Sequence, residues 1–118
     1  MVRSPGLPAL RKQLREFAAA RDWQQFHTPK NLAMALSVET AELLEHFQWL
    51  TPEESVRLNA RTARAVADEI ADVLLYLTRL ADVLDIDPLA AAARKLRANA
   101  RKYPVRKAKG NARKYTAL

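Results

Sequence analysis

The sequence predicts an all-α fold, most simply a bundle of four to five helices. Apolar residues recur at helical spacing along most of the 118 residues, and no segment alternates apolar and polar residues as a half-buried strand does. Three Thr-Pro or Asp-Pro pairs place an N-cap residue directly before a proline, which is a typical helix start. The chain has no internal repeat and no glycine-rich phosphate loop.

The proline pairs divide the chain into its expected elements. Helices are predicted to start at Thr28-Pro29, Thr51-Pro52 and Asp87-Pro88, because proline at the first helical position loses no hydrogen bond. Thr51 and Glu54 also have the spacing of a capping box. The predicted helices cover about 8–21, 29–49, 52–84 with a break near residue 59, and 87–102.

Composition narrows the class of protein. The chain has no cysteine, so disulfide scaffolds and cysteine-based metal or redox sites are excluded. No apolar run reaches the roughly 18 residues of a membrane span. The first six residues lack the apolar stretch of a signal peptide. We therefore expect a cytoplasmic protein that does not associate with membranes.

The positive charge is concentrated at the C-terminus. Residues 1–93 hold 10 Lys/Arg and 13 Asp/Glu, whereas residues 94–118 hold 10 Lys/Arg and no acid. Such a segment can bind nucleic acid, contact the phosphates of a small ligand, or be a solvated tail. We expect a helical domain over residues 1–104 and a basic C-terminal tail over residues 105–118.

Acidic residues occupy positions where apolar residues are expected. In helix 29–49, Glu39 falls within the apolar stripe, and Glu42 lies about 60° round the same side of the helix. In helix 52–84, Glu69 and Asp72 flank the stripe, again three residues apart, with Tyr76 between them in angle. The apolar stripes themselves consist of Leu32, Leu36, Leu43, Phe47 and Leu50 in the first helix, and Val66, Ile70, Val73, Leu77, Ala81 and Leu84 in the second.

Carboxylates that face a neighbouring helix need compensation, because an uncompensated buried charge is costly. No Lys or Arg occurs between Asn31 and Ser55 to form salt bridges. A bound cation is the other remedy, and oxygen ligands alone suit a hard ion such as Mg²⁺ or Mn²⁺. A di-iron centre needs Glu-x-x-His on two helices, and neither histidine follows a Glu by three residues. The simpler alternative is that these acids point to solvent on a broad polar flank.

Two further groups of residues are candidates for ligand contacts. Segment 22–28 is an aromatic-rich loop that either binds a ligand or packs Trp23 and Phe26 onto the helices. In the last helix, Lys95, Asn99 and Lys102 recur along one face. This basic strip suits a polyphosphate, although it also complements the negative end of the helix dipole.

The order of these motifs resembles a known family. Glu39-Thr-Ala-Glu42, 26 intervening residues and Glu69-Ile-Ala-Asp72 are similar to the E-x-x-E…E-x-x-D signature of MazG-like all-α NTP pyrophosphohydrolases. The resemblance covers about residues 10–116 and is greatest to the dCTP pyrophosphatase branch. The other segments that carry it are 21–32, Glu45-His46-Phe47-Gln48-Trp49, 72–77, 95–99, Lys102-Tyr103-Pro104 and Arg113-Lys114-Tyr115-Thr116.

The resemblance implies Mg²⁺-dependent hydrolysis of a nucleoside triphosphate to the monophosphate and pyrophosphate, with dCTP or 5-modified dCTP as substrate. It implies that one of the pair Glu39 and Glu42 also orients or deprotonates the attacking water. It further implies assembly into dimers or dimers of dimers. The implied metal ligands are Glu39, Glu42, Glu69 and Asp72; the implied base and sugar contacts are Trp23, His27, Trp49 and Tyr76; and the implied phosphate contacts are Lys95, Asn99 and Lys102.

Two alternatives remain open at this point. The same chemistry could act on another triphosphate such as dUTP or a modified nucleotide. A basic helical module that binds nucleic acid is the other alternative, supported by Tyr103 and Tyr115 among the basic residues. It leaves the four carboxylates without a role, so we do not expect nucleic acid as the partner.

Overall fold

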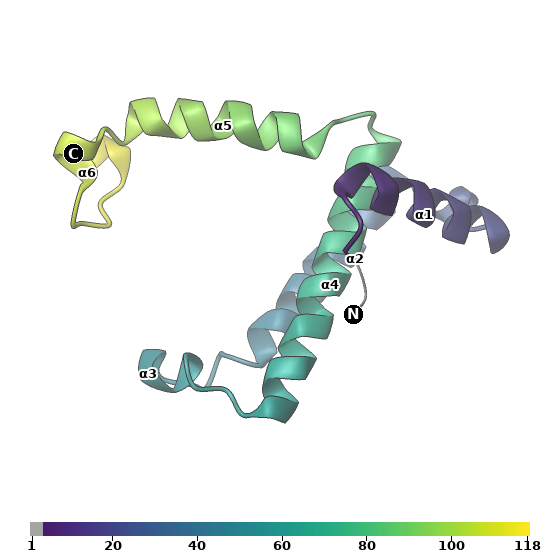
Figure 1. Ribbon diagram of the computed structural model, residues 1–118, viewed down its shortest axis with the longest axis horizontal. Helices are drawn as coiled ribbons and strands as arrows, with labels where there is room; N and C mark the ends of the chain where they lie inside the picture. The colour runs from purple at the N-terminus through teal and green to yellow at the C-terminus, as the bar shows by residue number, and fades with distance from the viewer. Residues whose placement is uncertain (1–3) are drawn as a thin grey trace. The chain divides into compact units, whose positions relative to one another are not determined.

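The computed structural model describes residues 4–118, and within that range the chain is helical with no strand, which confirms the all-α prediction (Figure 1). The chain divides into two compact units, one that ends at Asp85 and one that covers Ile86–Leu118. The first unit contains α1 (Leu7–Ala20), the 3₁₀ turn η1 (Gln24–Phe26), α2 (Pro29–Glu45), α3 (Pro52–Ser55) and α4 (Ala60–Val83). The second contains α5 (Pro88–Lys102), α6 (Val105–Ala108) and the 3₁₀ turn η2 (Tyr115–Ala117).

The helices begin where local capping dictates. The Thr28 hydroxyl accepts a hydrogen bond from the backbone N–H of Asn31, and Thr51 forms the predicted capping box with Glu54. The Asn59 side chain caps α4 by accepting a hydrogen bond from the backbone N–H of Thr62 at 2.8 Å. The expected break near residue 59 is therefore confirmed, and Asn59 is its cause.

Helix α2 lies antiparallel along α4. His27, just before α2, accepts a hydrogen bond from Arg79 near the end of α4. His46, just after α2, lies 4.0 Å from Glu69 in the first half of α4. Leu32 is fully buried, and Leu36 and Leu43 are partly buried on the same side of α2. This side is the predicted apolar stripe, with Glu39 in its middle.

The prediction of a helix to residue 49 is wrong, because α2 ends at Glu45. Hydrogen bonds between residues three positions apart follow. The N–H of His46 donates to the carbonyl of Leu43, and the N–H of Phe47 donates to the carbonyl of Leu44. These turns close the helix and bring the chain to the extended Thr51, which starts α3. An N-cap has a non-helical backbone, so the helix must stop upstream of it.

The stripe predicted for α4 is only half buried. Val66 and Ala81 are buried, but Ile70 is 53% exposed, and Leu77 and Leu84 are also exposed. The side of α4 that faces Glu39 of α2 includes Glu69 and Asp72, so the face toward α2 is rotated toward the acids. Periodicity located the apolar residues of α4, but the neighbouring helix decided which of them are covered.

Helix α1 packs against the C-terminal half of α4. Ala18 is the most buried residue of α1, at 1% exposure. Arg15 donates from Nε to the Asp82 carboxylate at 2.7 Å and makes a second bond to its other oxygen. The ion pair therefore holds α1 on the end of α4 that carries Arg79 and Asp82.

The second unit continues beyond α5. Asp87 caps α5 by accepting from the backbone N–H groups of Leu89 and Ala90. After Pro104 the chain forms the single turn α6, and the Tyr115 ring lies edge-on to that of Tyr103 at 6.0 Å. The basic C-terminal residues thus have local order that the charge pattern did not predict.

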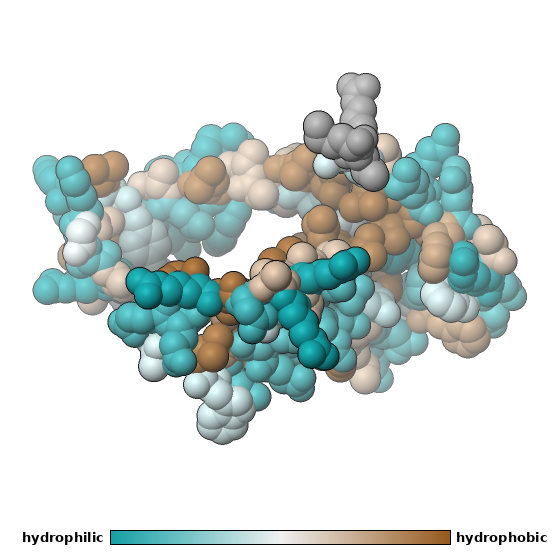
Figure 2. Space-filling model, turned by 60° about the horizontal axis from the view of Figure 1, so that its bottom comes forward, coloured by the Kyte–Doolittle hydropathy of each residue, from teal (hydrophilic) through white to brown (hydrophobic). Residues whose placement is uncertain are grey.

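No helix among residues 4–118 is long and apolar enough to cross a membrane. Large apolar side chains nevertheless remain at the surface, and Figure 2 shows hydrophobic residues interspersed with hydrophilic ones. On α2 the exposed group includes Met34, Val38 and Leu44, each more than half exposed. A single copy of the chain therefore leaves much of its apolar surface uncovered.

Candidate functional site

Three of the four predicted acids meet between α2 and α4. Glu39 of α2 and Glu69 and Asp72 of α4 each offer a carboxylate oxygen, and these oxygens all lie within 4.8 Å of one another. The antiparallel packing brings the middle of α2 opposite the middle of α4, so residues 30 positions apart become neighbours. We call Glu39, Glu69 and Asp72 the carboxylate cluster.

The carboxylate cluster carries unfavourable charge in the absence of a cation. Burial, followed by hydrogen bonding and repulsion from Glu42, raises the pKa of Glu39 to about 7. Burial also raises the pKa of Glu69, with the charge of Glu42 as the next cause. Glu42 therefore lies beside the cluster, as the spacing of E-x-x-E predicts.

The cluster fits a hard divalent cation. One oxygen of Glu39 and one of Glu69 are buried and have no hydrogen-bond partner among residues 4–118. A buried acceptor without a donor is costly, and a bound cation removes that cost. The imidazole Nε2 of His46 lies 4.0 Å from a carboxylate oxygen of Glu69. An all-oxygen set of ligands is typical of sites for hard ions.

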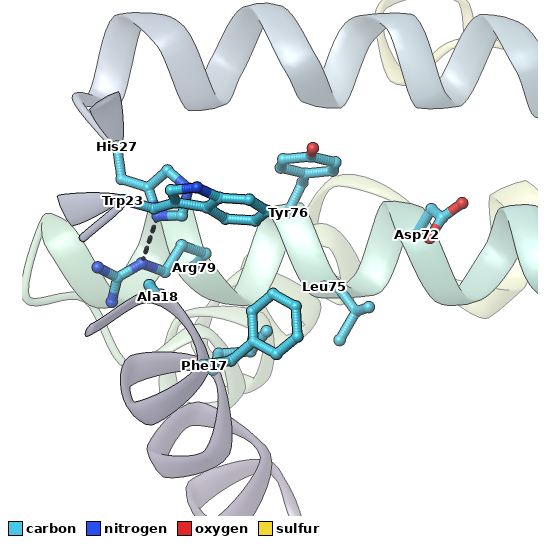
Figure 3. A pocket seen from close by; sticks show the side chains of 9 residues that line it. Phe17, Ala18, Trp23, His27, Asp72, Leu75, Tyr76 and Arg79 are labelled. Atoms are coloured by element: carbon cyan, nitrogen blue, oxygen red, sulfur yellow. Dashed lines mark hydrogen bonds between the residues drawn. The ribbon is translucent and has the colours of Figure 1, made fainter. Parts of the chain in front are cut away.

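A small aromatic cavity adjoins the carboxylate cluster, with a volume of about 160 Å³ (Figure 3). Asp72 belongs to both, because it is a member of the cluster and also lines the cavity. The sequence-predicted residues Trp23, His27 and Tyr76 line this cavity as well. The remaining lining residues are Leu14, Phe17, Ala18, Leu75 and Arg79.

The aromatic side chains of the cavity pack edge-on against one another. Trp23 lies edge-on to Phe17, with ring centroids 5.7 Å apart, and edge-on to His27 at 6.2 Å. The guanidinium of Arg21 lies 3.6 Å from the centre of the Phe17 ring. Trp23 nevertheless stays 42% exposed, so the loop does not bury it in the core. Its arrangement leaves a flat surface at the cavity, as a ligand-binding loop requires.

Sequence reasoning missed Arg79. This arginine is only 8% exposed and donates from Nε to Nδ1 of His27 at 3.1 Å. A basic residue flanked by Leu77 and Leu80 is a signal of a buried polar contact, but the sequence does not identify its partner. Burial, followed by the charge of Arg79, lowers the pKa of His27 and so favours the neutral ring.

Trp49 is not among the residues of the aromatic cavity. It follows α2 in the turns before α3, and its side chain is 87% exposed. An indole at this exposure gains little within one copy of the chain. Its part in a base-binding site stays a prediction.

The predicted phosphate contacts lie in the second unit. Lys95 and Lys102 are exposed on α5, and Asn99 is partly buried. The Lys102 ammonium lies 4.9 Å from the centre of the Tyr115 ring. This cation–π contact orients the lysine at the end of α5. The role of these three residues stays a prediction.

The chain is similar to known proteins in both sequence and fold. The sequence profile of the MazG-like family matches residues 34–118. The chain is 43% identical over 116 residues to dCTP pyrophosphatase 1 of Bos taurus, and this alignment covers 97% of the chain and 69% of the bovine protein. It is also 43% identical to dCTP pyrophosphatase 1 of Homo sapiens, again over 97% of the chain. The crystal structure of a pyrophosphatase from Archaeoglobus fulgidus superposes with a TM-score of 0.80 at 46% identity, covering 88% of this chain and 97% of that one. The chain therefore belongs to the MazG-like family.

Proposed function

We propose that this protein is a Mg²⁺-dependent nucleoside triphosphate pyrophosphohydrolase that converts dCTP, including 5-modified dCTP, to dCMP and pyrophosphate. The observation that carries this proposal is the double role of Asp72, which joins the carboxylate cluster to the aromatic cavity. A cation held by the acids would thus lie next to a surface on which a base can stack. The similarity to dCTP pyrophosphatase 1 supports dCTP as the substrate.

The metal ligands in this proposal are Glu39, Glu42, Glu69 and Asp72. Mg²⁺ held there supplies positive charge against the phosphate oxygens and the leaving pyrophosphate. Mn²⁺ prefers similar oxygen ligands and is the expected substitute. The two partnerless oxygens of Glu39 and Glu69 support a site for such an ion.

The bond that breaks joins the α-phosphorus to the oxygen that bridges to the β-phosphate. A water oxygen adds to the α-phosphorus, pyrophosphate leaves with the bridging oxygen, and a carboxylate accepts the proton of the water. Glu39 or Glu42 has this role in the proposal, because the two lie side by side at the cluster. General base catalysis of this kind contributes roughly 10²–10⁴-fold to the rate.

The nucleoside is proposed to bind at the aromatic cavity through Trp23, His27 and Tyr76, with Trp49 as a further contact. Stacking on an aromatic side chain is worth roughly 1–3 kcal/mol per base in nucleic-acid systems. Lys95, Asn99 and Lys102 are proposed to hold phosphate oxygens. Lys102 donates as a point charge and not as a bidentate fork, so it restricts the position of a phosphate less than arginine does.

A dimer or a dimer of dimers is the proposed assembly. The apolar residues exposed on α2 and α4 support it, since Met34, Leu44 and Ile70 are each more than half exposed. An exposed Trp49 is also explained if a second copy covers it or completes its site. A protein that is fully active as a 13.3 kDa monomer in light scattering would contradict this assembly.

Product analysis tests the activity directly. The protein is incubated with each dNTP and NTP, with and without Mg²⁺, and the products are separated by ion-exchange chromatography. Mg²⁺-dependent formation of dCMP and pyrophosphate, with dCTP ahead of the others, is the expected result. Preference for another triphosphate would keep the metal site and reject the choice of base. No turnover of any triphosphate would reject the proposed function.

A further inference from the structure

Among residues 4–118, a buried arginine donates the one hydrogen bond that the His27 ring makes at the aromatic cavity. The Arg79 side chain is 10% exposed, and its Nε donates to His27 Nδ1 at 3.1 Å (Figure 3). His27 has no second hydrogen bond from its ring to any residue of the range 4–118. The other ring nitrogen, Nε2, is therefore available to a ligand.

Arg79 is itself held in place. Its other arm lies 3.4 Å from Asp82, whose side chain is only 6% exposed. Asp82 is bound in turn by Arg15 through two hydrogen bonds, and Arg11 lies 3.9 Å away. The guanidinium of Arg79 is therefore held by two partners, Asp82 at one nitrogen and His27 at another.

This bond determines which nitrogen of His27 carries the proton. A guanidinium has only donors, so the nitrogen that it contacts must present a lone pair. His27 therefore accepts at Nδ1 and carries its single proton on Nε2. Besides His27 itself, the charged and titratable groups that line the cavity come from α4, namely Asp72, Tyr76 and Arg79, while α1 contributes only Leu14, Phe17 and Ala18.

We propose that Arg79 is a positioning residue that makes His27 a hydrogen-bond donor to the nucleobase, so that the cavity selects a base with an acceptor on the edge that faces Nε2. This inference rests on the proposed function for the identity of the ligand. Cytosine offers two adjacent acceptors on its pairing edge, O2 and the unprotonated N3. Uracil and thymine share the O2 acceptor but carry a proton on N3, which opposes the His27 donor where Nε2 faces that atom. Two donors that face each other leave both without an acceptor.

The test compares Arg79→Met with Arg79→Lys and Arg15→Met. Methionine removes the donor to His27 at similar volume, whereas lysine keeps a group that can only donate. Arg15→Met is the matched control, because it takes a guanidinium from Asp82 but leaves the bond to His27 intact. Circular dichroism confirms that each variant is folded.

Nitrogen-15 NMR of the imidazole rings gives the first measurement, and the only other histidine, His46, is the internal reference. In the wild type and in Arg15→Met we expect His27 with an unprotonated, hydrogen-bonded Nδ1 and a proton on Nε2. In Arg79→Met the Nδ1 signal moves to the position of a free ring that exchanges between its tautomers. Addition of dCMP shifts Nε2 of His27 more than addition of dUMP does.

Steady-state kinetics give the second measurement. The ratio of kcat/KM for dCTP to that for dUTP is expected to fall about tenfold in Arg79→Met, mainly through KM for dCTP. Arg79→Lys restores most of this ratio, and Arg15→Met leaves it unchanged. If Arg79 had a merely structural role, the substitution would lower kcat/KM for dCTP and for dUTP by the same factor. The ratio of the two values would then stay unchanged.

The outcomes separate this inference from the proposed function. An unchanged ratio and an unchanged His27 spectrum in Arg79→Met overturn the inference while dCTP hydrolysis stands. Equal changes in Arg15→Met and Arg79→Met also overturn it, because Arg15 does not contact His27. If no triphosphate is hydrolysed, the proposed function fails, and the dCMP titration decides the inference alone: a shift of His27 Nε2 supports it and no shift overturns it.

Discussion

Glu39 and Glu69 come from two different helices, and each keeps a buried carboxylate oxygen that has no hydrogen-bond partner among residues 4–118. Their oxygens lie within 4.8 Å of each other and of Asp72. Two acids in this arrangement oppose the packing of α2 on α4 unless a proton or a cation intervenes. The relationship makes the stability and the chemistry of this protein depend on the same few carboxylates.

Substitution Glu39→Gln removes one ligand and one negative charge from the carboxylate cluster. We expect loss of Mg²⁺ binding and of triphosphate turnover, while the metal-free protein stays at least as stable as the wild type because repulsion is relieved. Calorimetric titration with Mg²⁺, product analysis and thermal unfolding measure the three effects. Glu45→Gln is the control, since Glu45 is an exposed acid on the same helix. Full activity in Glu39→Gln would remove Glu39 from the metal site.

The metal-free protein should lose stability as the pH rises. The pKa of Glu39 is raised to about 7 by burial and by Glu42, so between its ordinary value of 4.5 and about 7 the folded protein retains a proton that the unfolded chain has released. Stability therefore decreases over this interval, because the unfolded state binds fewer protons. Urea midpoints between about pH 5 and about pH 8 measure the effect.

Mg²⁺ should reverse this trend, because it binds the ionised carboxylates of the folded state only. The contribution of His27 has the opposite sign: its lowered pKa costs stability as the pH falls through its ordinary value of 6.5. Glu39→Gln is the control, since it removes the contribution of Glu39 and leaves those of His27 and of Glu69, whose pKa is raised as well. A metal-free midpoint that rises steadily toward pH 8 would contradict the raised pKa of Glu39.

The two tryptophans should respond differently to truncation. Trp49 is 87% exposed, so Trp49→Ala is expected to change the stability of the single chain by no more than about 0.5 kcal/mol. Trp23 contacts Phe17 and lines the cavity, so Trp23→Ala should lower the free energy of unfolding as well as weaken nucleotide binding. Chemical unfolding and KM for dCTP measure the two properties. Unchanged KM in both variants would exclude base stacking on either ring.

Asp82 should be a stability residue and not a ligand. Its carboxylate holds Arg15 and Arg79, so Asp82→Asn is expected to lower the free energy of unfolding by about 2 kcal/mol. The pKa of Asp82 is lowered, and the hydrogen bond from Arg15 is the largest cause. Its contribution is thus present above the ordinary value of 3.8 and is lost as the pH falls below it.

Urea unfolding of Asp82→Asn at neutral pH measures this loss. Asp68→Asn is the matched control, because Asp68 lies exposed on the same helix. Equal stabilities of the two variants would show that the ion pair does not hold α1 on α4. The result also bears on Arg79, since a loosened guanidinium should broaden the NMR signal of His27.

Local chemistry explains what could be predicted of the fold. Thr28, Thr51 and Asp87 each cap a helix start, and the E-x-x-E and E-x-x-D pairs put two acids on one side of each helix. These features depend on residues three or four positions apart, so the chain sequence alone specifies them. The end of α2 at Glu45 was predicted too late, because a helical pattern continues through residues that the approach to α3 forces into turns.

The sequence by itself therefore determined the all-α class, the helix starts and the identity of the acids. Only the tertiary structure decided that Glu39, Glu69 and Asp72 meet, that Ile70 and Leu77 stay exposed, and that Arg79 bonds His27. His27 and Arg79 are 52 residues apart, and they meet only because α2 runs back along α4. Helical periodicity specifies the side of a helix to which a residue belongs, but the partner on that side depends on the packing of whole helices.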